Sequence, residues 1–210
     1  RGLLETKELI TQGMKGHPGL QFLWRRFDLN NLKRAYKLRF LEGKESIENF
    51  TEENGFSCFG ELSQEVLIQA VFQEEVDESI PKEFAQVIER APWIFEENQD
   101  FRSLEFALDR AHFDYLWKIT KKSHSSFLKE LFRFIVNSVN YRVLARHILI
   151  FQSPVTQEVW LPYGDFQFED VEKIETYEAL YEWTRMKTDF ILALKNVKKG
   201  DSSEKKMIKI

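Results

Sequence analysis

The sequence is poor in the residues that end regular structure and in cysteine. Its 9 Gly and 5 Pro in 210 residues are few for an all-β protein, which needs a tight turn about every ten residues. The single cysteine, Cys58, can form neither an internal disulfide nor a cysteine-based metal site, so nothing indicates an oxidising compartment. No apolar run approaches the roughly 20 residues that span a bilayer, and no signal pattern precedes the first charged stretch. We therefore expect a helical, soluble and cytoplasmic protein.

Two further absences bear on function. Neither glycine-rich pattern of a phosphate-binding loop occurs, so the sequence predicts no nucleotide site and no cofactor. The net charge of −4, without a basic patch interleaved with aromatic residues, argues against nucleic acid as a partner. What remains is a chain with 43% apolar residues and 19 Phe, which predicts a folded interior rich in phenylalanine.

Charge is segregated along the chain. Residues 1–41 carry nine bases and three acids (+6), and residues 42–100 carry three bases and sixteen acids (−13). Residues 101–150 have a net charge of +5, and the remainder has −2. Such runs are most often solvated helix faces. Alternatively, a basic and an acidic surface each meet a partner of opposite sign, which would make association depend on salt.

Helical periodicity recurs along most of the chain and predicts an all-α fold. Ser63 and Asp100 are each placed to cap the start of a helix. Pro81 suits the first turn of a helix, and Pro92 is expected to end that helix.

The other expected helices are described by their ranges. Two short helices flank a break at 16–19, a new helix opens near Asp28, one continuous helix covers 127–151, and a last one covers 169–198. Residues 153–170, with two prolines and a glycine, are predicted to form a loop or crossover. The 127–151 helix is expected to share one face among Phe127, Leu131, Phe134, Ile135, Ser138, Val139, Arg142 and Arg146.

Candidate chemistry is sparse. Glu105, Asp109 and His112 fall on one helical face, and the Asp-x-x-His spacing is similar to the Glu-x-x-His unit of di-metal bundles. A full site of that kind needs two His-bearing repeats, whereas solvated helix charges explain the same residues and a second acidic face at Glu175, Glu178 and Glu182. Cys58 could pair with His112, His124 or His147, but its surroundings carry no nucleophile motif, and a lone cysteine is more often a small buried residue. We predict neither a catalytic nor a metal site.

One pattern occurs twice. Asp28 and Asn31 are followed by mostly apolar positions and then by the bases Lys37 and Arg39. The same outline returns in Asn137, Asn140 and Arg146. Buried Asn and Arg cost free energy unless they are hydrogen-bonded, so Asn31, Asn140 and Arg146 are expected to have specific partners on adjacent helices. The pattern indicates either a duplicated helical unit or a chance recurrence.

These residues resemble the recurring unit of the C subunit of V/A-type ATPases, whose eukaryotic counterpart is subunit d. Asp28, Asn31, Leu32, Lys37 and Arg39 occupy the unit's positions, and Gly60, Leu62 and Ser63 stand for its turn, with Phe59 in place of the first Gly. Phe127, Leu128, Asn137, Asn140, Leu144 and Arg146 match the next occurrence, and Glu182, Ile191 and Lys195 weakly match the closing helix. The short length and the degraded turn indicate a divergent, short bacterial C-like member or a truncated chain.

The resemblance implies a funnel-like body of helical lobes, at about 1–75, 76–153 and 154–198, with a flexible tail at 199–210. It implies a non-catalytic central-stalk subunit that couples a coiled-coil shaft to the membrane rotor ring in ion transport, peripheral to the membrane. The basic residues Lys33, Arg34 and Lys37 are expected to bind an acidic partner surface. The alternatives are an unrelated helical adaptor or, behind it, a metal-dependent enzyme.

Overall fold

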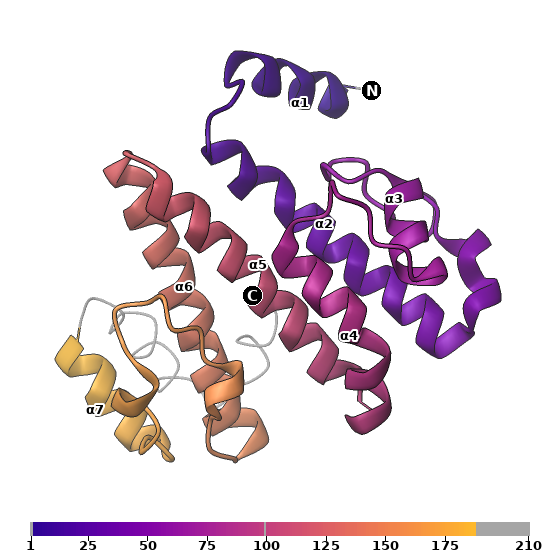
Figure 1. The fold of residues 1–210 in the computed structure, drawn as a ribbon. Helices are drawn as coiled ribbons and strands as arrows, with labels where there is room; N and C mark the ends of the chain where they lie inside the picture. The colour runs from indigo at the N-terminus through magenta and orange to yellow at the C-terminus, as the bar shows by residue number, and fades with distance from the viewer. Residues whose placement is uncertain (1, 99, 188–210) are drawn as a thin grey trace. The chain divides into compact units, whose positions relative to one another are not determined.

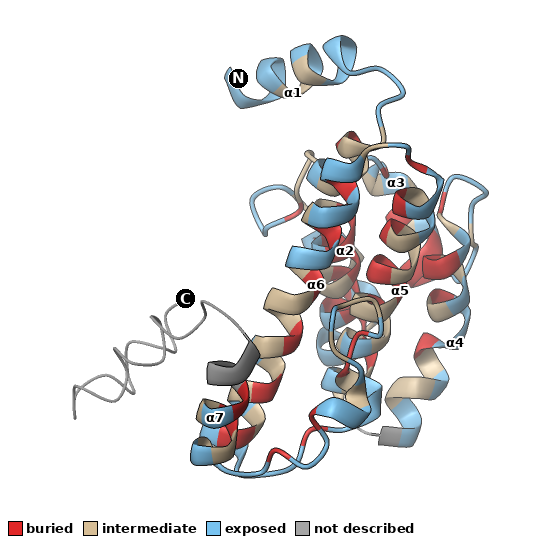
Figure 2. Ribbon diagram, turned by 90° about the vertical axis from the view of Figure 1, so that its left-hand side faces the viewer, coloured by how far each residue is buried: buried red, intermediate tan, exposed pale blue. Residues whose placement is uncertain are grey.

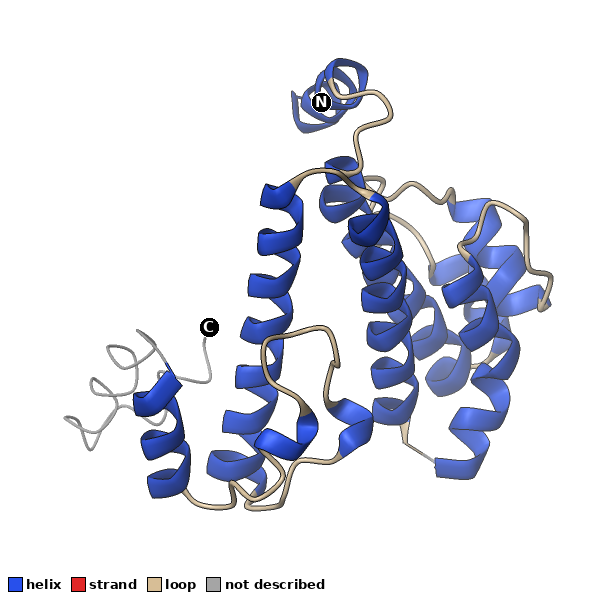
Figure 3. Ribbon diagram, turned by 60° about the vertical axis from the view of Figure 1, so that its left-hand side comes forward, coloured by secondary structure: helices blue, strands red, loops and turns tan. Residues whose placement is uncertain are grey.

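The computed structural model describes residues 2–98 and 100–187 (Figure 1). Every regular element in these ranges is helical, and none is a strand (Figure 3), which confirms the all-α prediction. Backbone contacts divide the chain into two compact units, Arg1–Phe134 and Ile135–Ile210. The three lobes expected at about 1–75, 76–153 and 154–198 concern internal repetition, on which this division does not bear, so they stay a prediction.

The first unit is built from five helices and the beginning of a sixth. These are α1 (Gly2–Gly13), α2 (Gly19–Lys37), α3 (Gln64–Ile68), α4 (Lys82–Asn98), α5 (Phe101–Lys122) and α6 (Ser126–Arg146). Both α2 and α3 continue directly into one π-helical turn, Leu38–Glu42 and Gln69–Gln73, and a 3₁₀ helix covers Lys44–Asn49. The core lies between α2, α3, α4 and α5, where Leu32, Tyr36 and Phe84 are fully buried (Figure 2).

Helix α2 is longer than its sequence pattern indicated. It begins at Gly19, directly after Pro18, and has no further Gly or Pro before Gly43. Asp28 and Asn31 therefore lie in the middle of α2, which corrects the expectation that they open a helix. Their neighbours Leu29 and Leu32 are buried in the core, so the two polar side chains are carried inward with them.

Pro92 does not end a helix, because it lies inside α4. A proline in this position removes the N–H that would bond to the carbonyl four residues earlier, here that of Ile88. The hydroxyl of the fully buried Tyr36 donates to this carbonyl oxygen at 3.3 Å. A side chain from α2 thus supplies the missing donor, and tertiary packing overrides the helix-ending tendency of proline.

Removing this hydroxyl should therefore cost stability in a way that depends on Pro92. Tyr36→Phe is expected to lower the free energy of unfolding by about 1–2 kcal/mol, since the Ile88 carbonyl loses a buried donor. In a Pro92→Ala background the Ala N–H can bond to that carbonyl, and the same change should cost less than half as much. Urea denaturation of the four variants measures this coupling. Equal costs in both backgrounds would contradict the account.

The predicted caps are confirmed. Ser63 Oγ accepts from Val66 N at 3.3 Å at the start of α3, and Asp100 Oδ1 accepts from Arg102 N at 2.9 Å at the start of α5. Lys121 and Lys122 lie in the last turn of α5, where positive charge offsets the helix dipole. The helix starts that Ser63 and Asp100 cap could therefore be predicted from the sequence alone.

The second unit continues α6 beyond Phe134. Its other elements are a π-helical turn at His147–Phe151, 3₁₀ helices at Gln157–Val159 and Phe168–Asp170, and α7 (Tyr177–Lys187). The last helix begins eight residues later than position 169. Thr176 Oγ1 accepts from Ala179 N at its start, and this cap sets the boundary. The rest of the expected helix, and the tail at 199–210, lie outside the described residues.

The inward face of α6 differs from the predicted one. The helix runs through most of the range 127–151, as expected, and its end is the π-helical turn. The buried residues are Leu128, Phe132, Val136, Asn140, Leu144 and, in the π-helical turn, Ile148, whereas the eight residues predicted to share one face are exposed or half-buried. Asn140 can be buried because both polar groups of its side chain are hydrogen-bonded, so an apolar count alone selects the wrong stripe.

Candidate functional site

Asp28 fixes the turn before α3 to the middle of α2. Its Oδ1 accepts from the backbone N–H of Glu61 at 2.9 Å and of Leu62 at 3.0 Å, and its Oδ2 accepts from Arg25 Nη1 at 3.0 Å. Burial raises the pKa of Asp28, while the two amides and the Arg25 charge act in the opposite direction. The carboxylate is fully buried and has a donor for each oxygen, so it serves as a structural anchor.

Asn31, one turn further along α2, holds the same loop at a second point. Its Nδ2 donates to the Ser57 carbonyl at 2.9 Å, and its Oδ1 accepts from the Ser57 N–H at 2.8 Å. The side-chain amide therefore satisfies both backbone groups of one loop residue, which corrects the expectation that its partner lies on an adjacent helix.

An equivalent arrangement occurs in the second unit. Asn140 Nδ2 donates to the Leu161 carbonyl at 2.8 Å, and its Oδ1 accepts from the Leu161 N–H at 2.9 Å. Asn137 Oδ1 accepts from the Asp165 N–H at 2.9 Å, and its Nδ2 donates to Asp165 Oδ2 at 2.7 Å. In both units a polar pair three residues apart on a long helix holds a following loop at two points.

Each held turn contains a glycine that has no space for a side chain. A Cβ at Gly60 would lie 2.2 Å from Asp28 Oδ1, and a Cβ at Gly164 would lie 2.5 Å from Asn137 Oδ1. The turns are Phe59-Gly60-Glu61 and Tyr163-Gly164-Asp165, an aromatic residue, a glycine and an acid in both cases. From the sequence, only the first turn was assigned to the repeated unit, and Gly164 was placed in the predicted loop at 153–170. The shared three-residue pattern was the signal that could have revealed the second.

The bases of the repeated pattern lie in different surroundings. Arg39 is buried, donates to the Val71 carbonyl and pairs with Glu74. Arg146 is exposed, which corrects the expectation that it needs a buried partner. It lies nine residues after Asn137, as Lys37 lies nine after Asp28, and Lys37 is exposed too. The position equivalent to Arg39 is occupied by Ile148.

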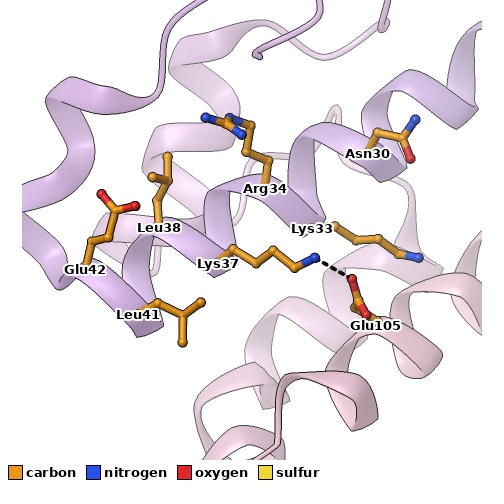
Figure 4. Close-up of a pocket in the computed structure, with 8 residues that line it drawn as sticks. All are labelled: Asn30, Lys33, Arg34, Lys37, Leu38, Leu41, Glu42 and Glu105. Atoms are coloured by element: carbon orange, nitrogen blue, oxygen red, sulfur yellow. Dashed lines mark ion pairs between the residues drawn. The ribbon is translucent and has the colours of Figure 1, made fainter. Parts of the chain in front are cut away.

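The three expected partner-binding bases line one hollow in the first unit (Figure 4). The hollow has a volume of about 530 Å³ and is lined by Asn30, Lys33, Arg34, Lys37, Leu38, Leu41, Glu42 and Glu105. Lys33 Nζ pairs with Asp109 at 2.6 Å, and Lys37 Nζ pairs with Glu105 at 2.9 Å. Two of the three bases therefore link α2 to α5. Within the described ranges Arg34 has no ion pair, and its buried Nε has no hydrogen-bond partner.

The metal candidates are engaged in this same packing. Glu105 and Asp109 pair with the two lysines, and His112 is buried beside them on α5. Burial, reinforced by the charges of Lys33 and Arg25, lowers the pKa of His112 to about 4, so the ring is neutral at neutral pH. In the part of the chain that the structure describes, no three or more His, Cys, Asp or Glu side chains are grouped so that they could hold a metal ion. The acidic face at Glu175, Glu178 and Glu182 is exposed.

Comparison with known families assigns the chain. The model of the ATP synthase (C/AC39) subunit family matches residues 4–209. The chain belongs to this family. Members of the C/AC39 family are accessory subunits of V/A-type ATPases that are in general non-catalytic, and membership implies partners among the other subunits. Neither the curated proteins nor the solved structures gave a match.

The C/AC39 assignment agrees with the resemblance inferred from Asp28, Asn31 and the turn at Gly60. Phe59 replaces the first glycine of the family's turn. Its ring packs against that of Phe27 on α2, with 5.5 Å between the ring centroids. Ile191 and Lys195, the weak match to the closing helix, lie outside the described residues. Over 2–98 and 100–187, no helix combines the length and the hydropathy needed to cross a membrane.

Proposed function

We propose that this C/AC39 subunit is a non-catalytic central-stalk component that couples the rotary shaft to the membrane rotor ring of a V/A-type ATPase during ion transport. The observation that carries the proposal is the family match over residues 4–209. In this role the chain binds a coiled-coil shaft on one surface and the membrane ring on another. It lies at the cytoplasmic face of the membrane and uses no cofactor of its own.

The internal structure of each unit suits a part that transmits force. Coupling a shaft to a ring requires elements that do not yield locally, and protein interiors transmit strain because they are densely packed. In the first unit, Asp28 and Asn31 tie a loop to α2 through four hydrogen bonds, and Arg25 on the same helix donates a fifth to Asp28. In the second, Asn137 and Asn140 do the same on α6. These ties support the proposal because they replace flexible loops with fixed ones.

The test is co-elution of the full chain with the purified stalk subunits of its own organism's V/A-type ATPase, in size-exclusion chromatography at low and high salt. We expect a stoichiometric complex that weakens as salt rises, since the charge segregation favours electrostatic association. A chain that is folded by circular dichroism but does not bind the stalk subunits would overturn the proposal. It would then favour the alternative, a helical adaptor for other partners.

A further inference from the structure

The hollow beside α2 leaves one positive charge without a partner. The charges of Lys33 and Lys37 are balanced by Asp109 and Glu105. Arg34 lines the same hollow and extends away from Glu105 (Figure 4), with no ion pair in the described part of the chain. Arg34 is half-buried and its Nε is closed to solvent, so a carboxylate from outside would have to pair with its Nη groups.

The position of Arg34 is fixed in advance of any binding. Its Cζ, Nε and Nη1 pack against Gly55, where an added Cβ would lie 3.3–3.4 Å from them. Gly55 has a φ of +93°, a conformation that glycine adopts readily. A guanidinium held against a backbone loses less entropy on binding, and its planar fork matches a carboxylate with two parallel hydrogen bonds.

The same hollow also has an apolar side chain in its lining. Leu41, in the π-helical turn that follows α2, lines the hollow and is 70% exposed. Glu42 lines the hollow beside Leu41. Among its described contacts, its Oε2 accepts one hydrogen bond, from Asn49 Nδ2 at 3.5 Å. A small anion such as phosphate would satisfy Arg34 but would leave Leu41 in water, whereas a protein segment can cover both.

We infer that this hollow receives an acidic helical segment of a partner subunit, whose carboxylate forms a bidentate ion pair with Arg34 and whose next apolar side chain packs on Leu41. The inference rests on the proposed function, because it names the chemistry of the surface by which the chain binds its stalk partner. It also assigns the binding to one base of the three. Lys33 and Lys37 act as internal links between α2 and α5.

The test compares Arg34→Glu with Arg26→Glu, a matched control on the same helix. Arg26 is exposed and does not line the hollow. Isothermal titration with the purified stalk subunits should show that Arg34→Glu weakens binding at least about tenfold, as expected for an interfacial charge pair. Arg26→Glu should change it less than about twofold. Arg34→Lys should restore only part of the affinity, because lysine cannot form the bidentate pair.

Circular dichroism and the unfolding midpoint of each variant show whether the fold is kept. If the stalk subunits bind Arg34→Glu as tightly as the unchanged chain, the inference is wrong and the proposed function stands. If the unchanged chain binds no stalk subunit, the proposed function fails, and the probe becomes a synthetic helical peptide with Glu and Leu on one face. Binding of this peptide that is lost in Arg34→Glu and with a Glu→Gln peptide would support the inference alone. Absence of such binding would overturn it.

Discussion

Replacing Asp28 by alanine is expected to lower the free energy of unfolding by about 3–5 kcal/mol, the range found when one partner of a buried ion pair is removed. Three donors lose their acceptor at once: Arg25 Nη1 and the backbone N–H groups of Glu61 and Leu62. Arg25 keeps a pairing with Glu61, whose side chain is 28% exposed, so its charge is not left wholly uncompensated. Urea denaturation followed by circular dichroism measures the loss.

The control for Asp28 is Asp114→Ala. Asp114 is also an Asp in the middle of a helix with an Arg partner, Arg110, at 3.5 Å, but its side chain is 35% exposed. We expect this change to cost less than about 1 kcal/mol, since exposed ion pairs contribute little. If the two substitutions cost the same, Asp28 is not the anchor that its hydrogen bonds indicate.

Replacing Asn140 by leucine should have the next largest effect, a loss of about 2–4 kcal/mol. Leucine has a similar size but leaves both the N–H and the carbonyl of the buried Leu161 without partners. The loss should be local to the second unit. Hydrogen exchange should therefore become faster in residues 155–171, while the turn at 57–62, held by Asp28 and Asn31 in the first unit, keeps its protection.

The matched control for this change is Asn137→Ala, because Asn137 bonds to Asp165 in a more exposed place. It should cost about 1 kcal/mol or less and change exchange mainly near Asp165. Protection of residues 155–171 that is unchanged in Asn140→Leu would show that other contacts hold this loop.

The parts of the fold that could be predicted from the sequence are those set by local chemistry. Ser63 and Asp100 cap their helices because a short polar side chain before a helical stretch meets the first free N–H groups wherever it occurs. Pro92 was misjudged because the donor that replaces its N–H, the Tyr36 hydroxyl, comes from a helix more than fifty residues earlier. Such long-range compensation leaves no local signal.

The sequence predicted which basic residues form the candidate site, but not which of them are paired within the protein. A basic stretch at Lys33, Arg34 and Lys37 is visible in the sequence, and all three line one hollow. Their acidic partners on α5 are about seventy residues away in the chain, so only the structure separates the two paired lysines from the unpaired arginine. Reversing all three charges would also break two internal links, and the single Arg34 change is therefore the cleaner experiment.

The tight approach of Gly60 to Asp28 and of Gly164 to Asn137 has a consequence for how this sequence can diverge. Every substitution of glycine adds a Cβ, and at either position that atom would overlap an oxygen of the helix side chain. A substitution of Gly60 is therefore tied to a substitution of Asp28, and one of Gly164 to one of Asn137. A lineage can enlarge the turn residue only after shortening its helix partner, and during that interval the loop is held by one polar residue instead of two.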